Sequence, residues 1–168
     1  SISYKLVNYL NSAYFARRHP VSSIPRAIAY LGERGLRMFI SLIATSRLVD
    51  NKPDELLRIS AIRAKFLEQI AIDLDMDSGE FFMLGLFSLL DAMLDNSMEH
   101  LVGQLPLQAH VNEALVMRTG KLAPYLRLVE YYETCNWTAL DKQLAELRID
   151  PEKIQGYYLN AVRLADFF

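Results

Sequence analysis

The side chains of this chain that could hold a metal ion or carry a proton are its histidines and the acidic residues near them. The histidines are His19, His100 and His110. They are too far apart in sequence for two of them to form an i, i+4 ligand pair on one helix. We expect solvated polar positions. In the alternative, His100 and His110 meet across two helices and, together with nearby carboxylates, form the ligand set of a hydrolytic metal ion. The candidate carboxylates are Asp91, Asp95, Glu99 and Glu113.

Nucleophilic catalysis has no visible pattern in the sequence. There is no Ser/His/Asp or Cys/His arrangement, and no glycine-rich loop of the kind that binds phosphate. The single cysteine, Cys135, lies beside Asn136 and Trp137, and we expect it to be half-buried at a junction between helices. A single cysteine cannot form an intrachain disulfide, so the sequence gives no sign of an oxidising compartment. We therefore expect a cytoplasmic protein.

One arginine lies where an apolar side chain is expected. Arg63 falls in the middle of the apolar stripe of a helix predicted to start at Pro53. The stripe consists of Leu56, Ile59, Phe66 and Ile70. A guanidinium there must be paired or must reach the rim of the core. Arg63 either binds a carboxylate or phosphate ligand, or forms a salt bridge to an acidic residue such as Asp91. We favour the salt bridge.

Helical periodicity runs through the whole sequence, and no segment alternates as a strand would. Capping residues such as Asp77, Asn136 and Asp150 mark helix starts, and glycines such as Gly120 mark helix ends. We therefore predict one all-α domain over residues 1–168, a single compact multi-helix bundle. The expected helices cover residues 4–10, 25–32, 36–48, 53–74, 77–94, 98–105, 108–118, 124–133, 138–147 and 151–168.

The helix that opens at Asp77 is predicted to be the central one. Small residues share a narrow sector of this helix, and apolar residues cover most of its remaining circumference. The sector consists of Phe81, Gly85, Ser88 and Ala92. A helix that is apolar all round is usually buried, and a stripe of small residues lets a neighbouring helix approach closely. We therefore expect Ser88 to lie on a tightly packed face.

Three short motifs near the start of the chain resemble the HDOD family, an output domain related to metal-dependent HD phosphohydrolases. They are Asn11-Ser12-Ala13-Tyr14-Phe15, Ser23-Ile24-Pro25-Arg26-Ala27-Ile28 and Leu31-Gly32. The resemblance implies the helical fold of the HD phosphohydrolases and a role in bacterial signalling. It also implies structural roles for the family-motif positions Asn11, Ser12, Gly32, Gly85 and Ser88.

The same resemblance shows what this chain lacks. HD relatives read Gly-Leu-Leu-His-Asp where this chain reads Gly85-Leu86-Phe87-Ser88-Leu89. A further histidine ligand of those relatives aligns with Ile59. Serine, leucine and isoleucine at these places do not supply the imidazole and carboxylate donors that such a metal needs. We therefore expect no enzyme and no cofactor. The alternatives are a residual metal-dependent phosphohydrolase and a small-molecule sensor that uses the vestigial metal cleft.

The second half of the chain resembles one HDOD subgroup, in which HDOD follows an EAL-type domain that hydrolyses cyclic di-GMP. The residues that carry this likeness are 82–94, Leu105-Pro106-Leu107, 128–133 and Trp137. The chain opens within a predicted helix, so we expect a fragment truncated at its N-terminus. The resemblance implies a non-catalytic regulatory module that contacts a protein partner or an attached signalling domain.

Composition narrows the partners further. Net charge is −2, with 11 Lys/Arg against 5 Asp/Glu in residues 1–70 and 7 against 15 in residues 71–168. No basic cluster with interleaved aromatics indicates nucleic acid, and no apolar run reaches the length of a membrane helix. A hydrophobic fraction of 52% fits either a large core or an interface, such as that of a homodimer. Arg17, Arg18 and Arg26 form the basic group that we expect to bind a partner.

Overall fold

The computed structural model describes residue 32 and residues 53–165, and every regular element in them is a helix. The prediction of an all-α fold is therefore confirmed. The helices are α4 (Pro53–Asp73), α5 (Ser78–Phe87), α6 (Leu90–Leu94), α7 (Met98–Val102), α8 (Ala109–Val116), α9 (Ala123–Glu133), α10 (Trp137–Leu147) and α11 (Pro151–Ala165).

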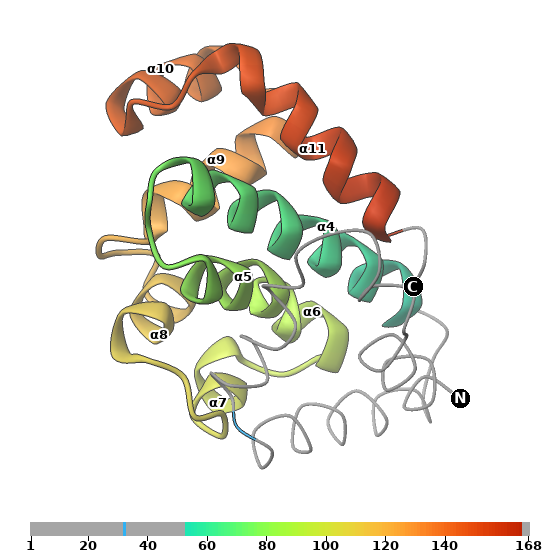
Figure 1. Ribbon diagram of the computed structural model, residues 1–168. Helices are drawn as coiled ribbons and strands as arrows, with labels where there is room; N and C mark the ends of the chain where they lie inside the picture. Colours follow the sequence, from blue (N-terminus) through green and yellow to red (C-terminus); the bar gives the residue numbers. More distant parts are fainter. Residues whose placement is uncertain (1–31, 33–52, 166–168) are drawn as a thin grey trace.

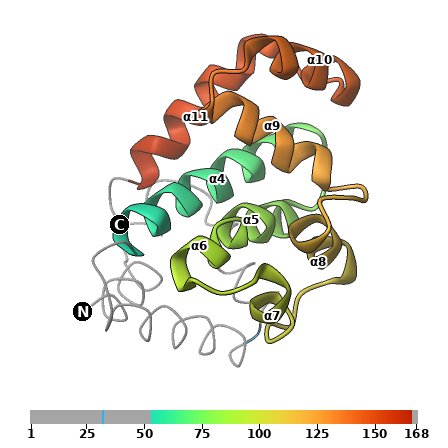
Figure 2. The same ribbon diagram turned by 180° about the vertical axis from the view of Figure 1, so that it is seen from behind.

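Helix α4 is the axis of the described part of the chain. Figures 1 and 2 show it crossing the middle, with α5 to α8 on one side and α9 to α11 on the other. Its most extensive contact is with α5, followed by its contact with α11, and α9 and α6 touch it as well. Helices α8 and α9 also pack against each other, so the two sides are joined beyond α4. Within the described residues, no helix combines the length and apolar character needed to cross a membrane.

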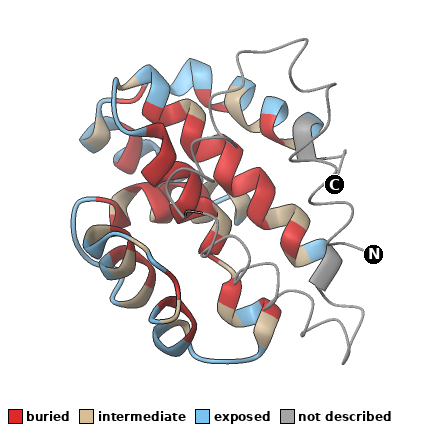
Figure 3. Cartoon of the chain, turned by 60° about the horizontal axis from the view of Figure 1, so that its bottom comes forward, coloured by how far each residue is buried: buried red, intermediate tan, exposed pale blue. Residues whose placement is uncertain are grey.

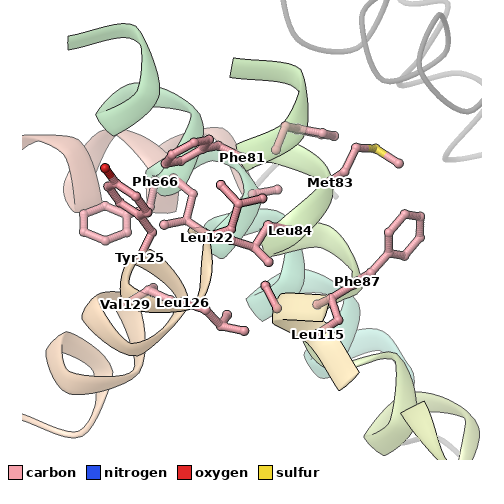
Figure 4. Packing of buried hydrophobic residues seen from close by; sticks show 14 of the residues in the cluster. Phe66, Phe81, Met83, Leu84, Phe87, Leu115, Leu122, Tyr125, Leu126 and Val129 are labelled. Carbon is pink, nitrogen blue, oxygen red and sulfur yellow. The ribbon is translucent and has the colours of Figure 1, made fainter. Parts of the chain in front are cut away.

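The core lies where α4, α5 and α9 meet. Figure 3 shows buried residues concentrated along the central helices, with exposed residues on the outer ones. In Figure 4, Phe81 of α5 lies against Tyr125 of α9, with a ring-centroid distance of 4.6 Å and edge-on geometry. Leu122 and Leu126 are fully buried beside them. Burial of these large side chains supplies the main stabilising free energy of the fold.

Gly85 sets the distance between α4 and α5. A Cβ atom added there would lie 2.4 Å from the backbone nitrogen of Ala64 and 2.5 Å from the carbonyl carbon of Arg63. No side chain fits at such distances from backbone atoms, so only glycine permits this approach. The expected close packing along the small-residue face is therefore confirmed at Gly85.

The predicted helix starts follow from local hydrogen bonds. The carboxylate of Asp77 accepts from the amides of Gly79 at 2.9 Å and Glu80 at 3.3 Å. Asn136 accepts from the amide of Ala139 at 3.3 Å, and Asp150 accepts from the amide of Glu152 at 3.0 Å, directly before α11. Each of these bonds satisfies an amide that lacks a partner at a helix start.

The predicted helix 77–94 is wrong as a single element. Helix α5 ends at Phe87, Ser88 and Leu89 form a turn, and the short helix α6 begins at Leu90. The hydroxyl of Ser88 donates to the carbonyl oxygen of Gly85 at 2.7 Å, and Leu89 leaves helical geometry with φ −122° and ψ 18°. Because the helix breaks there, Ala92 leaves the small-residue sector and is exposed.

Other expectations need correction or concern residues that the structure does not describe. Cys135 is exposed rather than half-buried, and it adopts a left-handed φ of 55° in the turn between α9 and α10. Helix α7 ends three residues earlier than predicted and α8 ends two residues earlier, while the last three residues of the helix expected over 151–168 lie outside the described residues. The helices expected in residues 4–10 and 36–48 lie outside the described residues.

Candidate functional site

The positions that align with the metal ligands of HD relatives lie on α4 and at the end of α5. Ile59 is half-buried on α4, Ser88 is buried in the turn after α5, and Leu89 follows it, half-buried. A serine hydroxyl between two aliphatic side chains is a poor donor set for a divalent hydrolytic metal. The residues present therefore do not fit the metal centre of the HD phosphohydrolases.

A guanidinium contacts Ser88 at this place. The side chain of Arg63 is buried, with 7% of the residue exposed, and its Nη1 donates to Ser88 Oγ at 3.1 Å. The other edge of the guanidinium binds Glu133 at the end of α9. Nε lies 3.0 and 3.1 Å from the two carboxylate oxygens, and Nη2 lies 2.6 Å from Oε2. This forked contact is the strongest geometry available to an arginine and a carboxylate.

The salt bridge expected for Arg63 is therefore confirmed, but its partner is Glu133. The sequence had suggested Asp91 as an example. Arg63 is one turn beyond Ile59 on α4, and Glu133 is the last residue of α9, so 70 residues separate the two charges along the chain. Ser88 joins them from the end of α5, in the turn after Phe87, because its hydroxyl both accepts from Arg63 and donates to the carbonyl oxygen of Gly85. We call the contacts of Arg63, Ser88, Glu133 and Gly85 the Arg63 cluster. It ties three helices together.

Aromatic rings border the Arg63 cluster. Tyr132 and Tyr158 lie 4.5 Å apart between ring centroids, and both contact the buried ring of Phe66, at 5.8 and 5.5 Å. Trp137 meets Tyr132 edge-on at 5.8 Å and is 53% exposed. Burial raises the pKa of Tyr158, and the nearby negative charge of Glu133 adds to that rise. The rings thus extend from the core to the surface beside the ion pair.

The histidines do not assemble the alternative metal site. His110 Nε2 contacts Glu80 Oε1, and Lys121 Nζ lies 3.5 Å from the other oxygen of that carboxylate. His100 instead lies 2.9 Å from the side-chain nitrogen of Gln104, in the turn that follows α7. Across residues 53–165 there is no group of three His, Cys, Asp or Glu side chains that could hold a metal ion. The alternative in which His100 and His110 share carboxylates is therefore wrong, because the two histidines have different partners.

A second charged contact joins α4 to the C-terminal helices at the surface. Lys153 Nζ on α11 lies 2.8 and 3.1 Å from the carboxylate oxygens of Asp73, the last residue of α4. The hydrogen bond from Lys153 lowers the pKa of Asp73, and the same bond raises the pKa of Lys153. Both side chains are partly solvated, so water screens this pair.

The remaining predicted site residues fall into two groups. Arg17, Arg18, Arg26, Asn11 and Ser12 lie outside the described residues. Gly32 has a left-handed φ of 64°, which favours glycine.

Glu133 is the residue that sequence reasoning missed. Its only signal was negative: an arginine within an apolar stripe requires an anion, and the sequence offered many acidic residues without ranking them.

Comparison with known proteins identifies the family of this chain. The family described as the HDOD domain matches residues 1–116. A protein named cyclic di-GMP phosphodiesterase CdgJ, from Vibrio cholerae, is 36% identical over 165 residues, which cover 97% of this chain and 38% of that protein. An uncharacterized protein of Bacillus subtilis, YuxH, is 31% identical over 166 residues, covering 96% of this chain and 40% of YuxH. The chain thus spans less than half the length of these relatives. No solved structure matches it significantly.

Proposed function

This chain belongs to the HDOD domain family, and from that membership we propose that it is a non-catalytic regulatory module of cyclic di-GMP signalling. It works by contact with a protein partner or with an attached signalling domain. The link to the second messenger rests on the Vibrio cholerae relative, whose name states a cyclic di-GMP phosphodiesterase. The chain aligns with 38% of that protein. The proposal therefore assigns the hydrolytic activity to the remainder, which the resemblance implies is an upstream EAL-type domain.

The observation that carries the non-catalytic role is the guanidinium at Ser88. Arg63 binds Ser88 and Glu133 at the place where HD relatives are expected to hold their metal. A buried positive charge that is already paired disfavours a divalent cation beside it, because like charges repel strongly in a poorly solvated site. Ile59 and Leu89 supply no donors there either.

Regulation by contact requires an accessible binding surface. The basic residues Arg17, Arg18 and Arg26 remain the proposed partner-binding group, and a homodimer is a further assembly that the proposal includes. A cytoplasmic location belongs to the same proposal, because the one cysteine of the chain forms no intrachain disulfide.

Metal analysis combined with a hydrolysis assay tests the absence of catalysis. The purified chain is analysed for bound metal, then incubated with Mn²⁺ or Mg²⁺ and either bis-p-nitrophenyl phosphate or cyclic di-GMP. We expect no stoichiometric metal and no metal-dependent hydrolysis. Gly156→Ala on α11, where an added Cβ meets nothing within 4 Å, serves as a matched control, because it lies outside the candidate site and should leave any activity of the chain unchanged. Hydrolysis that requires metal and disappears in a His110→Ala variant would instead establish the residual phosphohydrolase, whose ligand set was expected to include His110.

Partner binding is tested by affinity capture from cell extract with three forms of the chain. The wild type is compared with an Arg17→Ala, Arg18→Ala, Arg26→Ala variant. The control removes the same charge elsewhere, at the exposed residues Arg118, Arg148 and Arg163. We expect a protein that the wild type and the control retain and the first variant loses. Equal capture by all three folded forms would contradict the assignment of the basic group.

A further inference from the structure

The carboxylate that binds Arg63 comes from outside the part of the chain that matches the HDOD family. The family match ends at residue 116, and α9, which carries Glu133, begins at Ala123. Arg63 and Ser88 lie inside the match. The HDOD part therefore brings a buried cation and a hydroxyl, and the helices that follow bring the anion that satisfies them.

The chemistry of Arg63 limits what can take the place of Glu133. An arginine remains charged at all physiological pH values, and a buried charge without a counter-ion is strongly destabilising. The forked N–H donors of Nε and Nη2 match the two oxygens of a carboxylate. Ser88 adds a hydroxyl on the opposite edge of the guanidinium, and this fixes the orientation of the arginine. Only another oxyanion can replace Glu133 without a large loss of free energy.

Glu133 is also the more accessible member of the pair. Its side chain is 17% exposed, against 9% for Arg63. It is the last residue of α9, directly before the turn that contains Cys135. The helix itself is held by the buried side chains of Leu126, Leu128 and Val129. Rotation of the Glu133 side chain towards solvent therefore does not require α9 to leave the core.

We propose that Arg63 and Ser88 form a carboxylate-binding site whose resident occupant is Glu133 of the same chain. The ligand that exchanges with Glu133 is an acidic side chain. That this side chain comes from a signalling partner rests on the proposed function, whereas the binding of a carboxylate by Arg63 and Ser88 does not. The site replaces the vestigial metal centre with a receptor for one carboxylate group.

Chemical rescue tests the site without knowledge of the partner. Glu133→Ala removes one methylene and the carboxylate, which are the atoms that acetate can replace. We expect acetate at about 0.2 M to raise the Tm of Glu133→Ala by about 3 °C more than acetamide, the neutral molecule of the same shape. The wild type should show no such difference, because Glu133 already occupies the site. The emission of Trp137, the only tryptophan, should change over the same acetate range.

Two variants identify the binding residues. Glu130→Ala removes a carboxylate from the same helix, one that pairs with the exposed Arg118, and should show no preference for acetate. Arg63→Met combined with Glu133→Ala should lose the rescue completely, because the receptor cation is gone. If acetate and acetamide act equally on Glu133→Ala, or if acetate still acts on the double variant, the proposal is overturned.

A folding defect in Glu133→Ala would not remove the test. In that case the variant is refolded from denaturant in acetate and in acetamide, and the yield of folded protein replaces Tm. A higher yield in acetate alone supports the site, and equal yields overturn it. The rescue needs neither an enzyme assay nor a partner, so it can fail while the regulatory role stands, and it can succeed if the regulatory role fails.

Discussion

Helix α4 is held in two different ways on its two sides. Towards α5 the backbones approach each other over Gly85, and the contact depends on the absence of a side chain. Towards α9 and α11 the contact depends on paired charges and aromatic rings: Arg63 with Glu133, Asp73 with Lys153, and Phe66 with two tyrosines.

The difference teaches which side tolerates change. Close-packed backbone atoms cannot move apart without opening the core, so the α5 side is sensitive to any added atom. Paired side chains can separate and be replaced by other partners, at a free-energy cost that depends on how deeply each pair is buried. The α9–α11 side is therefore the one suited to respond to a ligand or partner.

The largest expected effect is at Gly85. Gly85→Leu places a side chain against the backbone of α4, and we expect a loss of more than about 5 kcal/mol, comparable with the whole stability of a small domain. The measurement is urea unfolding followed by circular dichroism. The control is Gly156→Leu on α11, where an added Cβ meets nothing within 4 Å. It should gain about 0.5 kcal/mol from helix propensity. Equal behaviour of the two variants would contradict the close approach.

Removal of the buried carboxylate should have the next largest effect. Glu133→Ala leaves Arg63 buried and unpaired, and we expect a loss of about 3 kcal/mol in the free energy of unfolding. Glu130→Ala breaks the exposed pair with Arg118 and should cost only about 0.5 kcal/mol. Denaturant unfolding of both variants in the same buffer measures the difference. A cost for Glu133→Ala as small as that for Glu130→Ala would show that water already screens Arg63.

A double substitution should have a smaller effect than the single one. Arg63→Met with Glu133→Met removes both charges and leaves apolar side chains of similar length, so no buried charge is left without a partner. We expect the double variant to lie within about 1 kcal/mol of the wild type. A double-mutant cycle from urea unfolding measures the coupling between the two residues. If the double variant instead lost the sum of the stability losses of the two single variants, the two side chains would not interact.

The smallest effect on stability is expected at the surface pair of Asp73 and Lys153, and this effect depends on pH. The pKa of Asp73 is lowered from its usual 3.8, so its contribution to stability is present above pH 3.8 and is lost as pH falls through the lower folded value. The pKa of Lys153 is raised from 10.5, so its contribution is present below pH 10.5 and is lost as pH rises through the higher folded value. The Tm of the wild type should therefore exceed that of Asp73→Asn between these limits, and the two should converge at acid pH.

Salt separates this surface pair from the buried one. Added sodium chloride should reduce the difference between the wild type and Asp73→Asn, because exposed charges are screened. The deficit of Glu133→Ala should change little, since its cation is buried. Thermal unfolding at low and high salt provides both comparisons. If the loss of Tm in Glu133→Ala vanished at high salt, the Arg63–Glu133 pair would be as exposed to solvent as the surface pair.

Sequence patterns predicted the parts of this protein that depend on neighbours along the chain. Helical periodicity, the caps at Asp77, Asn136 and Asp150, and the stripe of small residues that contains Gly85 all lie within a few turns of one helix, so they can be identified without a structure. The family was equally visible, because its motifs are short and contiguous.

Only the tertiary structure decided the rest. Periodicity treated residues 77–94 as one helix, but the bond from the Ser88 hydroxyl to Gly85 and the packing against α4 end it at Phe87. Arg63 was expected to need an anion, yet Glu133, 70 residues away, became its partner because α9 ends beside α4. The sequence determines where charges and helix ends lie along the chain. Only folding determines which of them meet, because distance in space depends on every helix between them.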